Sequence, residues 1–290
     1  MIPHTYKNFF KQVGHGGDFQ VEFNPVTRSY DDFFKCTLRD AEYIWDHKSG
    51  KLNLMFSGGI DSEYMVNVFR YLKMDFEVVI IRLLPNYNDH DVNDALEYCQ
   101  QHNIKPTIID LDFNKFVESG KMLDIAKSCG CAWHQIPATL DVISKLDGNV
   151  IMACNDPHLF KKEDGTWFLD VLEYQQSIAN WFNKNSIDGT PYFMGYSAET
   201  FLSFLQETAI IELVNNQRPG KLGTYSSRID FYSKPWPMKK RQKYTGYEII
   251  EKDNIFQHPN MLQFKTQLQG FNGIYEIEYS SLLKKLKGTL

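Results

Sequence analysis

The sequence predicts an α/β fold, in which a parallel sheet with flanking helices is followed by a mostly helical C-terminal portion. An apolar run at 52–56 ends in a short glycine-rich loop, after which residues 63–73 carry apolar side chains at helical spacing. Further apolar runs at 76–84, 106–111 and 149–154 alternate with helical patterns. Strands that alternate with helices indicate βαβ units, and therefore a parallel sheet.

The loop after the first of these strands reads Ser57-Gly58-Gly59-Ile60-Asp61-Ser62. A loop at the start of a helix presents unpaired backbone N–H groups and the positive end of the helix dipole, so it favours an anion. Two adjacent glycines allow the backbone to approach that anion closely. The chain contains no G-x-x-x-x-G-K-[ST] and no complete G-x-G-x-x-G, which excludes the two commonest nucleotide-binding loops.

These six residues match the signature S-G-G-x-D-S, and the loop resembles that of the PP-loop ATP pyrophosphatase superfamily, which includes asparagine synthetase and 7-cyano-7-deazaguanine synthase. The order of strands and helices between residues 50 and 160 is also similar. The resemblance implies an adenine nucleotide alpha hydrolase-like fold with ATP and Mg²⁺ as cofactors. The loop residues that it implies in nucleotide binding are Ser57, Gly58, Gly59, Ile60, Asp61 and Ser62.

The same resemblance implies a site that extends beyond the loop. The strand end at Arg82 and Leu83 corresponds to the side on which the family binds adenine. Asp61 is implied as a catalytic residue and, together with Asp156, as a magnesium ligand. Asn155 and Asp156 follow a buried strand, and match loosely the polar turn that faces the nucleotide in the family. An Asx turn explains them equally well.

The reaction that the resemblance implies is the adenylation of a small-molecule substrate. A carbonyl or carboxylate oxygen attacks the α-phosphorus of ATP, pyrophosphate leaves, and a nitrogen nucleophile then displaces AMP. Residues 1–50 leave no room for the glutaminase domain of asparagine synthetases, so we expect nitrogen from free ammonia, an amine or a partner. Three alternatives stay open: sulfur transfer to tRNA or a small molecule, a phosphoadenylyl-sulfate reductase-like activity, and a non-catalytic nucleotide-binding regulator.

Three segments are expected along the chain. Residues 1–50 form an N-terminal strand and helix extension, 51–160 the ATP-binding α/β core, and 161–290 a helical cap with a basic C-terminal segment packed on the core. Within them, apolar spacing predicts helices at 33–45, 89–102, 114–128 and 137–146, and a mostly helical region at 170–218 that includes Val171 and Leu172. A short strand at 18–23 and a terminal strand at 273–279, followed by a basic helix, complete the prediction.

A basic stretch lies near the end of this otherwise acidic chain. Its cations are Lys234, Lys239, Lys240, Arg241 and Lys243. A triphosphate requires cations, and the glycine-rich loop supplies no lysine, so Lys234 and Lys240 are the candidate catalytic cations. For any one of these residues taken alone, a solvated surface charge is the simpler interpretation.

Composition and charge restrict the class of protein. The chain has 290 residues, of which 43% are hydrophobic, so it can form one large domain or a main domain with an appendage. A net charge of −5 argues against general nucleic-acid binding, although a tRNA substrate stays open, as does a homodimer. No apolar run reaches the length of a membrane span and no signal peptide is visible, so we expect a cytoplasmic protein without membrane contact.

The cysteines are few and spread thinly. Five of them fit reduced thiols better than a disulfide framework. Cys129 and Cys131 form the one close pair, which is a redox or sulfur-carrying pair, half of a zinc site or, more simply, two buried small residues at a turn.

Overall fold

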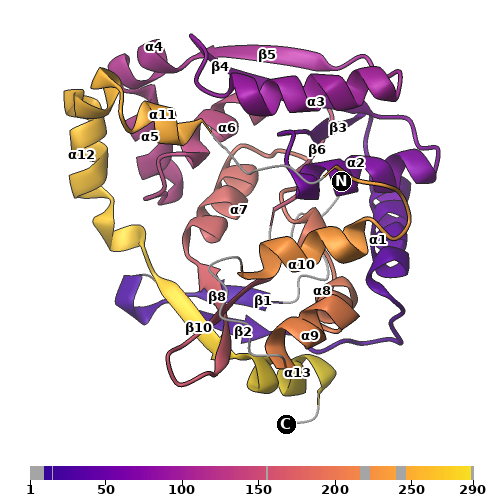
Figure 1. Ribbon diagram of the computed structural model, residues 1–290. Coiled ribbons are helices and arrows are strands. Elements are labelled where there is room, and N and C mark those ends of the chain that lie inside the picture. The colour runs from indigo at the N-terminus through magenta and orange to yellow at the C-terminus, as the bar shows by residue number, and fades with distance from the viewer. Residues whose placement is uncertain (1–9, 15, 155, 216–222, 240–245, 289–290) are drawn as a thin grey trace.

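A five-stranded sheet forms the centre of the computed structural model, which describes residues 10–14, 16–154, 156–215, 223–239 and 246–288 (Figure 1). The strand order is β5-β4-β3-β6-β9. The strands are β3 (Leu52–Met55), β4 (Glu77–Leu84), β5 (Thr107–Asp112), β6 (Asn149–Ile151) and β9 (Gly189–Thr190). Every pairing in this sheet is parallel, which confirms the predicted α/β fold with a parallel sheet.

Each face of the sheet packs on its own hydrophobic core. Leu54 of β3 and Ile80 of β4 belong to one core, whereas their chain neighbours Met55 and Val79 belong to the other. Successive side chains of a strand point to opposite faces. Burial on both faces therefore explains why these strands appear in the sequence as continuous apolar runs.

Two sets of helices cover these cores (Figure 1). Residues of the first core come from α1 (Phe33–His47), α2 (Ile60–Tyr71), α3 (Asp89–Gln101), α8 (Ala198–Leu205), α9 (Thr208–Asn215), α10 (Gly223–Tyr232) and α13 (Tyr279–Lys287). Residues of the second come from α4 (Phe113–Glu118), α5 (Lys121–Cys129), α6 (Ile136–Ile143), α7 (Tyr174–Lys184), α11 (Tyr247–Ile250) and α12 (Pro259–Gln267). Short 3₁₀ turns occur at Gly16–Asp18, Phe193–Gly195, Asn254–Gln257 and Gln269–Phe271.

Two antiparallel sheets complete the fold. One contains β7 (His158–Lys161), β8 (Trp167–Leu172) and β10 (Ile274–Glu278) in the order β10-β8-β7, and the other pairs β1 (Phe10–Val13) with β2 (Gln20–Phe23). The prediction of helix at Val171 and Leu172 is therefore wrong. In β8 buried and half-buried residues alternate, as a strand with one face on the core requires.

Two further differences from the predicted elements have local causes. The helix expected at 114–128 is divided into α4 and α5 at Gly120, whose φ of +78° is left-handed. The strand β9 falls in a segment for which the sequence predicts only a turn, and its Gly189 lies so close to β6 that a Cβ would approach the Val150 carbonyl oxygen to 2.0 Å. The central sheet thus includes one strand, β9, that lies beyond residue 160 in the sequence. The segment boundaries at 50 and 160 stay a prediction.

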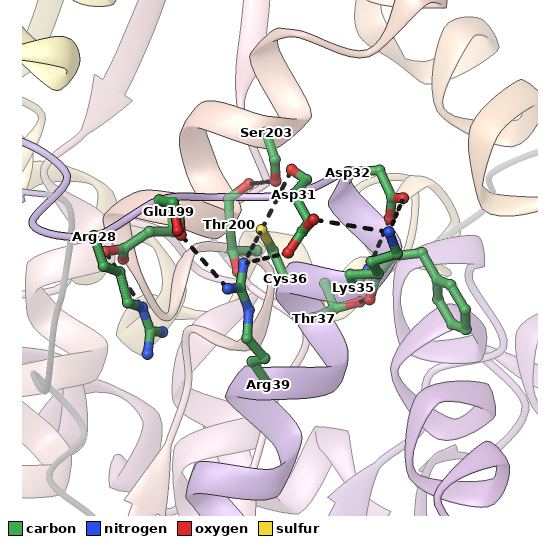
Figure 2. A network of polar contacts seen from close by, with 12 residues as sticks. Arg28, Asp31, Asp32, Lys35, Cys36, Thr37, Arg39, Glu199, Thr200 and Ser203 are labelled. Atoms are coloured by element: carbon green, nitrogen blue, oxygen red, sulfur yellow. Dashed lines mark hydrogen bonds and ion pairs between the residues drawn. The ribbon is translucent and has the colours of Figure 1, made fainter.

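Polar side chains connect the segment before α1 with α1 and α8 (Figure 2). Arg28 Nε lies 3.5 Å from Glu199 Oε1, and Arg39 Nη2 lies 3.6 Å from Asp31 Oδ2. These ion pairs hold the segment before α1 against the helical part of the chain. Across the part of the chain that the structure describes, no helix combines the length and the apolar composition needed to cross a membrane.

Candidate active site

The glycine-rich loop lies between β3 and α2, at the carboxyl end of the middle strand of the parallel sheet. Gly58 has a φ of +79°, and a Cβ there would lie 2.3 Å from the carbonyl oxygen of Asp91 in α3. Glycine is required at this position because the first turn of α3 packs directly on the loop. Gly59, with a φ of −76°, is the N-cap of α2.

The two serines of the loop hold it from within. Ser57 N–H donates to Ser62 Oγ at 3.3 Å, and Ser62 Oγ donates to the carbonyl oxygen of Gly59 at 2.9 Å. The first N–H groups of α2 have no helical acceptor and are directed out of the helix end. The loop therefore has the geometry of the anion sites that helix N-termini provide.

Asp61, in the first turn of α2, contacts a buried arginine from α10. Arg228 Nη1 lies 2.9 Å from Oδ1 and 3.0 Å from Oδ2 of Asp61, and it also donates to Asp156 Oδ2. The arginine side chain is only 7% exposed, whereas those of Asp61 and Asp156 are 21% and 28% exposed. One guanidinium nitrogen thus joins the two carboxylates that the resemblance implies as magnesium ligands.

Aromatic packing fixes α10 in this position. The hydroxyl of Tyr232 donates to Asp61 Oδ1 at 3.0 Å, and its ring stacks on Tyr64 of α2 with centroids 4.4 Å apart. Phe33 of α1 stacks on Tyr232 at 5.7 Å. Burial raises the pKa of Tyr232 well above its usual value, so the hydroxyl stays protonated and donates.

A pocket of about 580 Å³ opens at this edge of the sheet, and all six loop residues line it. Its volume suits a small-molecule ligand, and the carboxyl ends of parallel strands are where α/β folds bind ligands. Apolar side chains such as Ile80, Met152 and Ile178 form part of its wall. Among the described residues, its charged lining consists of Asp61, Asp91, Asp94, Asp156, Asp170 and Arg228, together with the titratable His158.

At the strand end that the resemblance implies as the adenine side, the side-chain amide of Asn88 holds two backbone groups of β4. Leu83 N–H donates to Asn88 Oδ1 at 2.7 Å, and Asn88 Nδ2 donates to the carbonyl oxygen of Ile81 at 2.9 Å. This N–H and this carbonyl, two residues apart, form the donor and acceptor pair that the edge of an adenine ring complements. Arg82 is not in the pocket lining, because its guanidinium pairs with Asp110 of β5 at 2.8 Å.

His158 and Asp170 meet where β7 and β8 line the pocket. Nδ1 of His158 lies 2.7 Å from Oδ1 of Asp170, and this hydrogen bond raises the pKa of the imidazole. The interaction fixes the orientation of the ring beside the carboxylates described above.

Asp61 and Asp156 fit a magnesium site in which phosphates supply the other oxygen ligands. In the described part of the chain, no group of three or more His, Cys, Asp or Glu side chains could hold a metal ion. In nucleotide sites, however, Mg²⁺ is usually held by one or two carboxylates and by the phosphates of the substrate. Two carboxylates that converge on a single cation meet that requirement when phosphates supply the remaining oxygens.

Besides Arg82, three predicted site residues are not placed in the pocket. Lys234 Nζ pairs with Glu207 Oε2 at 2.6 Å and is not part of the pocket lining. Asn155 and Lys240 lie outside the described residues. The roles predicted for these three residues stay predictions.

The cysteine pair flanks a left-handed glycine at the end of α5. Cys129 and Cys131 are 3% and 0% exposed, and Gly130 between them has a φ of +73°. A hydrogen bond to Cys131, together with burial, raises the pKa of Cys129. Neither thiol lines the pocket, so their placement agrees with the simplest interpretation, two buried small residues at a turn.

Sequence reasoning missed Arg228, as it missed other pocket residues such as His158 and Asp170. The helix Gly223–Tyr232 carries no motif, and more than 160 residues separate Arg228 from Asp61. The available signal was an arginine next to the apolar and aromatic residues Ile229, Phe231 and Tyr232. A buried arginine requires a carboxylate partner, although the sequence does not say which.

No protein-family model matches this chain, and no curated protein matches its sequence. Among solved structures, the chain is similar to the NH3-dependent NAD synthetase from Campylobacter jejuni subsp. jejuni NCTC 11168 in complex with the nitrate ion. The match covers 82% of this chain and 94% of that chain, with 17% sequence identity and a TM-score of 0.37. Similarity of this degree decides nothing about the function of this chain, which is inferred below from its own geometry.

Proposed function

We propose that this chain is an AMP-forming ligase of the ATP pyrophosphatase type. In the first step a carbonyl or carboxylate oxygen of a small-molecule substrate attacks the α-phosphorus of ATP. The bond from this phosphorus to the bridging oxygen of the β-phosphate breaks, and pyrophosphate leaves. In the second step a nitrogen nucleophile attacks the activated carbon and loses a proton, while the carbon–oxygen bond to AMP breaks.

The observation that carries this proposal is the junction of loop and helix at the sheet edge. The loop has the sequence S-G-G-x-D-S, Gly58 has the left-handed conformation that keeps the loop against α3, and all six residues line the pocket. Backbone N–H groups at the start of α2, with the hydroxyl of Ser57, are donors suited to the departing pyrophosphate, and Ser62 would join them only by giving up its hydrogen bond to the Gly59 carbonyl. Catalysis by such a site is mostly positioning and electrostatic stabilisation.

The remaining pocket residues have roles that follow from their chemistry. Apolar side chains such as Ile80 and Met152 exclude water from the reacting groups. Arg228 supplies a fixed positive charge beside the loop. A magnesium ion held by Asp61, Asp156 and the phosphates would neutralise part of the phosphate charge and polarise the phosphorus–oxygen bonds.

The charge of the pocket favours nitrogen over sulfur as the second nucleophile. The described lining contains five aspartates and one arginine. Such a lining attracts ammonium or a protonated amine, and repels the anionic thiolate or persulfide that sulfur transfer requires. This is the physical reason for preferring amide formation to thiolation.

Calorimetric titration with ATP and Mg²⁺ tests the nucleotide site without knowledge of the substrate. The double variant Ser57→Ala/Asp61→Ala is expected to lose ATP binding. It should stay folded, because Arg228 keeps its hydrogen bond to Asp156. The matched control is Asp46→Ala/Ser49→Ala, which changes the same residue types outside the pocket and should bind like the wild type. Unchanged affinity in the folded loop variant would remove the basis of the proposal.

Product analysis then tests the reaction. With ATP, Mg²⁺, ammonium and a pool of small carboxylates, turnover should release AMP and pyrophosphate in equal amounts. If the main products are ADP and inorganic phosphate, the proposed cleavage between the α- and β-phosphates is wrong.

A further inference from the structure

Arg228 bridges the two carboxylates that are the candidate metal ligands. Its Nη1 contacts Asp61 at 2.9 and 3.0 Å and also contacts Asp156, so one nitrogen bridges a carboxylate after β3 and a carboxylate after β6. Two carboxylates this close repel each other unless a cation lies between them. In this structure the guanidinium of Arg228 supplies that cation.

The arginine is confined to this position by its surroundings. Its side chain is 7% exposed, and the neighbouring Tyr232 on the same helix stacks on Tyr64 and donates to Asp61. A buried guanidinium without an anionic partner is strongly destabilising. Arg228 can therefore leave the two carboxylates only when another anion is available to it inside the pocket.

We propose that Arg228 competes with a divalent cation for Asp61 and Asp156, and that a phosphate group is its alternative partner. The identity of that phosphate as part of a nucleotide rests on the proposed function. A guanidinium forms charge-assisted, paired hydrogen bonds with phosphate oxygens as readily as with carboxylates. Arg228, rather than a lysine of the loop, is then the fixed cation that the triphosphate meets.

Competition of this kind predicts opposite changes in the affinities for the cation and for ATP, which a purely structural role of Arg228 does not predict. Replacing Arg228 by methionine removes the cation that bridges the two carboxylates, so a divalent cation should bind them more tightly in the absence of nucleotide. The same replacement removes the fixed cation, so ATP should bind more weakly at saturating Mg²⁺. A residue that only supports the fold would weaken both ligands when it is removed.

The test is a titration of nucleotide-free protein with Mn²⁺ alone. The electron paramagnetic resonance signal of the free ion measures how much Mn²⁺ stays unbound. Arg228→Met should bind Mn²⁺ about tenfold more tightly than the wild type, and ATP at least about tenfold more weakly, since each tenfold change corresponds to about 1.4 kcal/mol. The matched control is Arg39→Met, which removes the same charge from the ion pair with Asp31 outside the pocket (Figure 2). It should leave the Mn²⁺ affinity unchanged.

Arg228→Lys keeps a cation and serves if the methionine variant does not fold. An ammonium on a shorter side chain cannot span both carboxylates as well as arginine does, so Mn²⁺ should bind this variant about threefold more tightly than the wild type. Equal Mn²⁺ affinity in the wild type and in the folded variants overturns the inference. The Mn²⁺ measurement uses no nucleotide, so it can succeed even where the test of AMP formation fails, and the two failures are distinguishable.

Discussion

Gly58 and Gly59 are adjacent, but only one of them needs to be glycine. A Cβ on Gly58 would lie 2.3 Å from the Asp91 carbonyl oxygen at a φ of +79°, whereas a Cβ on Gly59 meets nothing closer than Ser57 Oγ at 3.4 Å. Left-handed backbone alone costs an alanine about 1–2 kcal/mol, and the clash with α3 adds to it. Gly58→Ala should therefore lower the free energy of unfolding by about 2 kcal/mol or more.

Denaturant unfolding of both variants decides this prediction. Gly59→Ala has a permitted φ of −76° and is the internal control. It should cost only a few tenths of a kcal/mol to about 1 kcal/mol, as at other N-cap positions. Equal stability of the two variants would show that the loop is not pressed against α3.

Asp40 lies away from the pocket, and its ionisation makes the stability of the fold depend on pH. It is fully buried between α1 and α8, and burial raises its pKa from 3.8 to about 6. Its Oδ2 accepts hydrogen bonds from Ser197 Oγ at 2.9 Å and from Thr200 Oγ1 at 2.5 Å, which lower the pKa but do not offset burial. Because the folded-state pKa is raised, the stabilising contribution of the protonated form is complete below about pH 4 and is lost as the pH rises through about 6.

Asp40→Asn should remove this dependence. Both hydroxyls donate to the same oxygen, so an asparagine can accept both hydrogen bonds. Between pH 4 and pH 7, the free energy of unfolding of the variant should rise relative to that of the wild type by up to about 3 kcal/mol. Each tenfold change in proton affinity corresponds to about 1.4 kcal/mol. Urea unfolding across that range measures it, with the exposed Asp46→Asn on the same helix as control. A stability difference that does not change with pH would contradict the assignment.

At the scale of single elements, the sequence predicted what depends on short stretches of chain. The strand, loop and helix around Ser57–Ser62 are specified by an apolar run, two glycines and a helical repeat that adjoin one another. The β7–β8 hairpin was missed, although Asp164-Gly165 between two runs of alternating residues is a hairpin signal. The docking of α10 depends on aromatic contacts between distant segments, such as Tyr232 on Tyr64, which no local pattern encodes.

The basic stretch between 234 and 243 remains to be tested as an element. Lys234 and Lys239 pair with Glu207 and Glu97, and neither lysine lines the pocket. We still predict that at least one change to alanine within the stretch weakens ATP binding about tenfold, as the loss of one charge-assisted contact would. These two ion pairs make Lys240, Arg241 or Lys243 the expected position of that loss.

An alanine scan of the five cations, followed by ATP titration, measures this effect. Lys234→Ala should act mainly on stability, because Glu207 is buried and also accepts from the backbone N–H of Phe33. If all five variants bind ATP like the wild type, the stretch is solvated surface and Arg228 alone supplies the fixed cation.

At the scale of the whole molecule, charge determines the conditions under which a nucleotide can bind. The chain has a net charge of −5, and the described lining of the pocket holds five aspartates against one arginine. ATP brings about four negative charges, of which a magnesium ion offsets two. ATP without a divalent cation should therefore be repelled from the site, whereas ATP with Mg²⁺ should bind.

Thermal unfolding of the whole chain measures this need for a divalent cation. The site joins the loop after β3 to α10, which lies far along the chain, so a bound ligand stabilises the entire fold. A ligand at a hundredfold excess over its dissociation constant stabilises the folded state by about 2.7 kcal/mol. For a chain of 290 residues, that corresponds to a rise in Tm of about 4 °C with ATP and Mg²⁺. ATP with a chelator should give no rise, and the Ser57→Ala/Asp61→Ala variant should give none in either buffer. A rise that is equally large without the divalent cation would mean that the aspartates do not face the phosphates, and the orientation of the nucleotide in the pocket would have to be reversed.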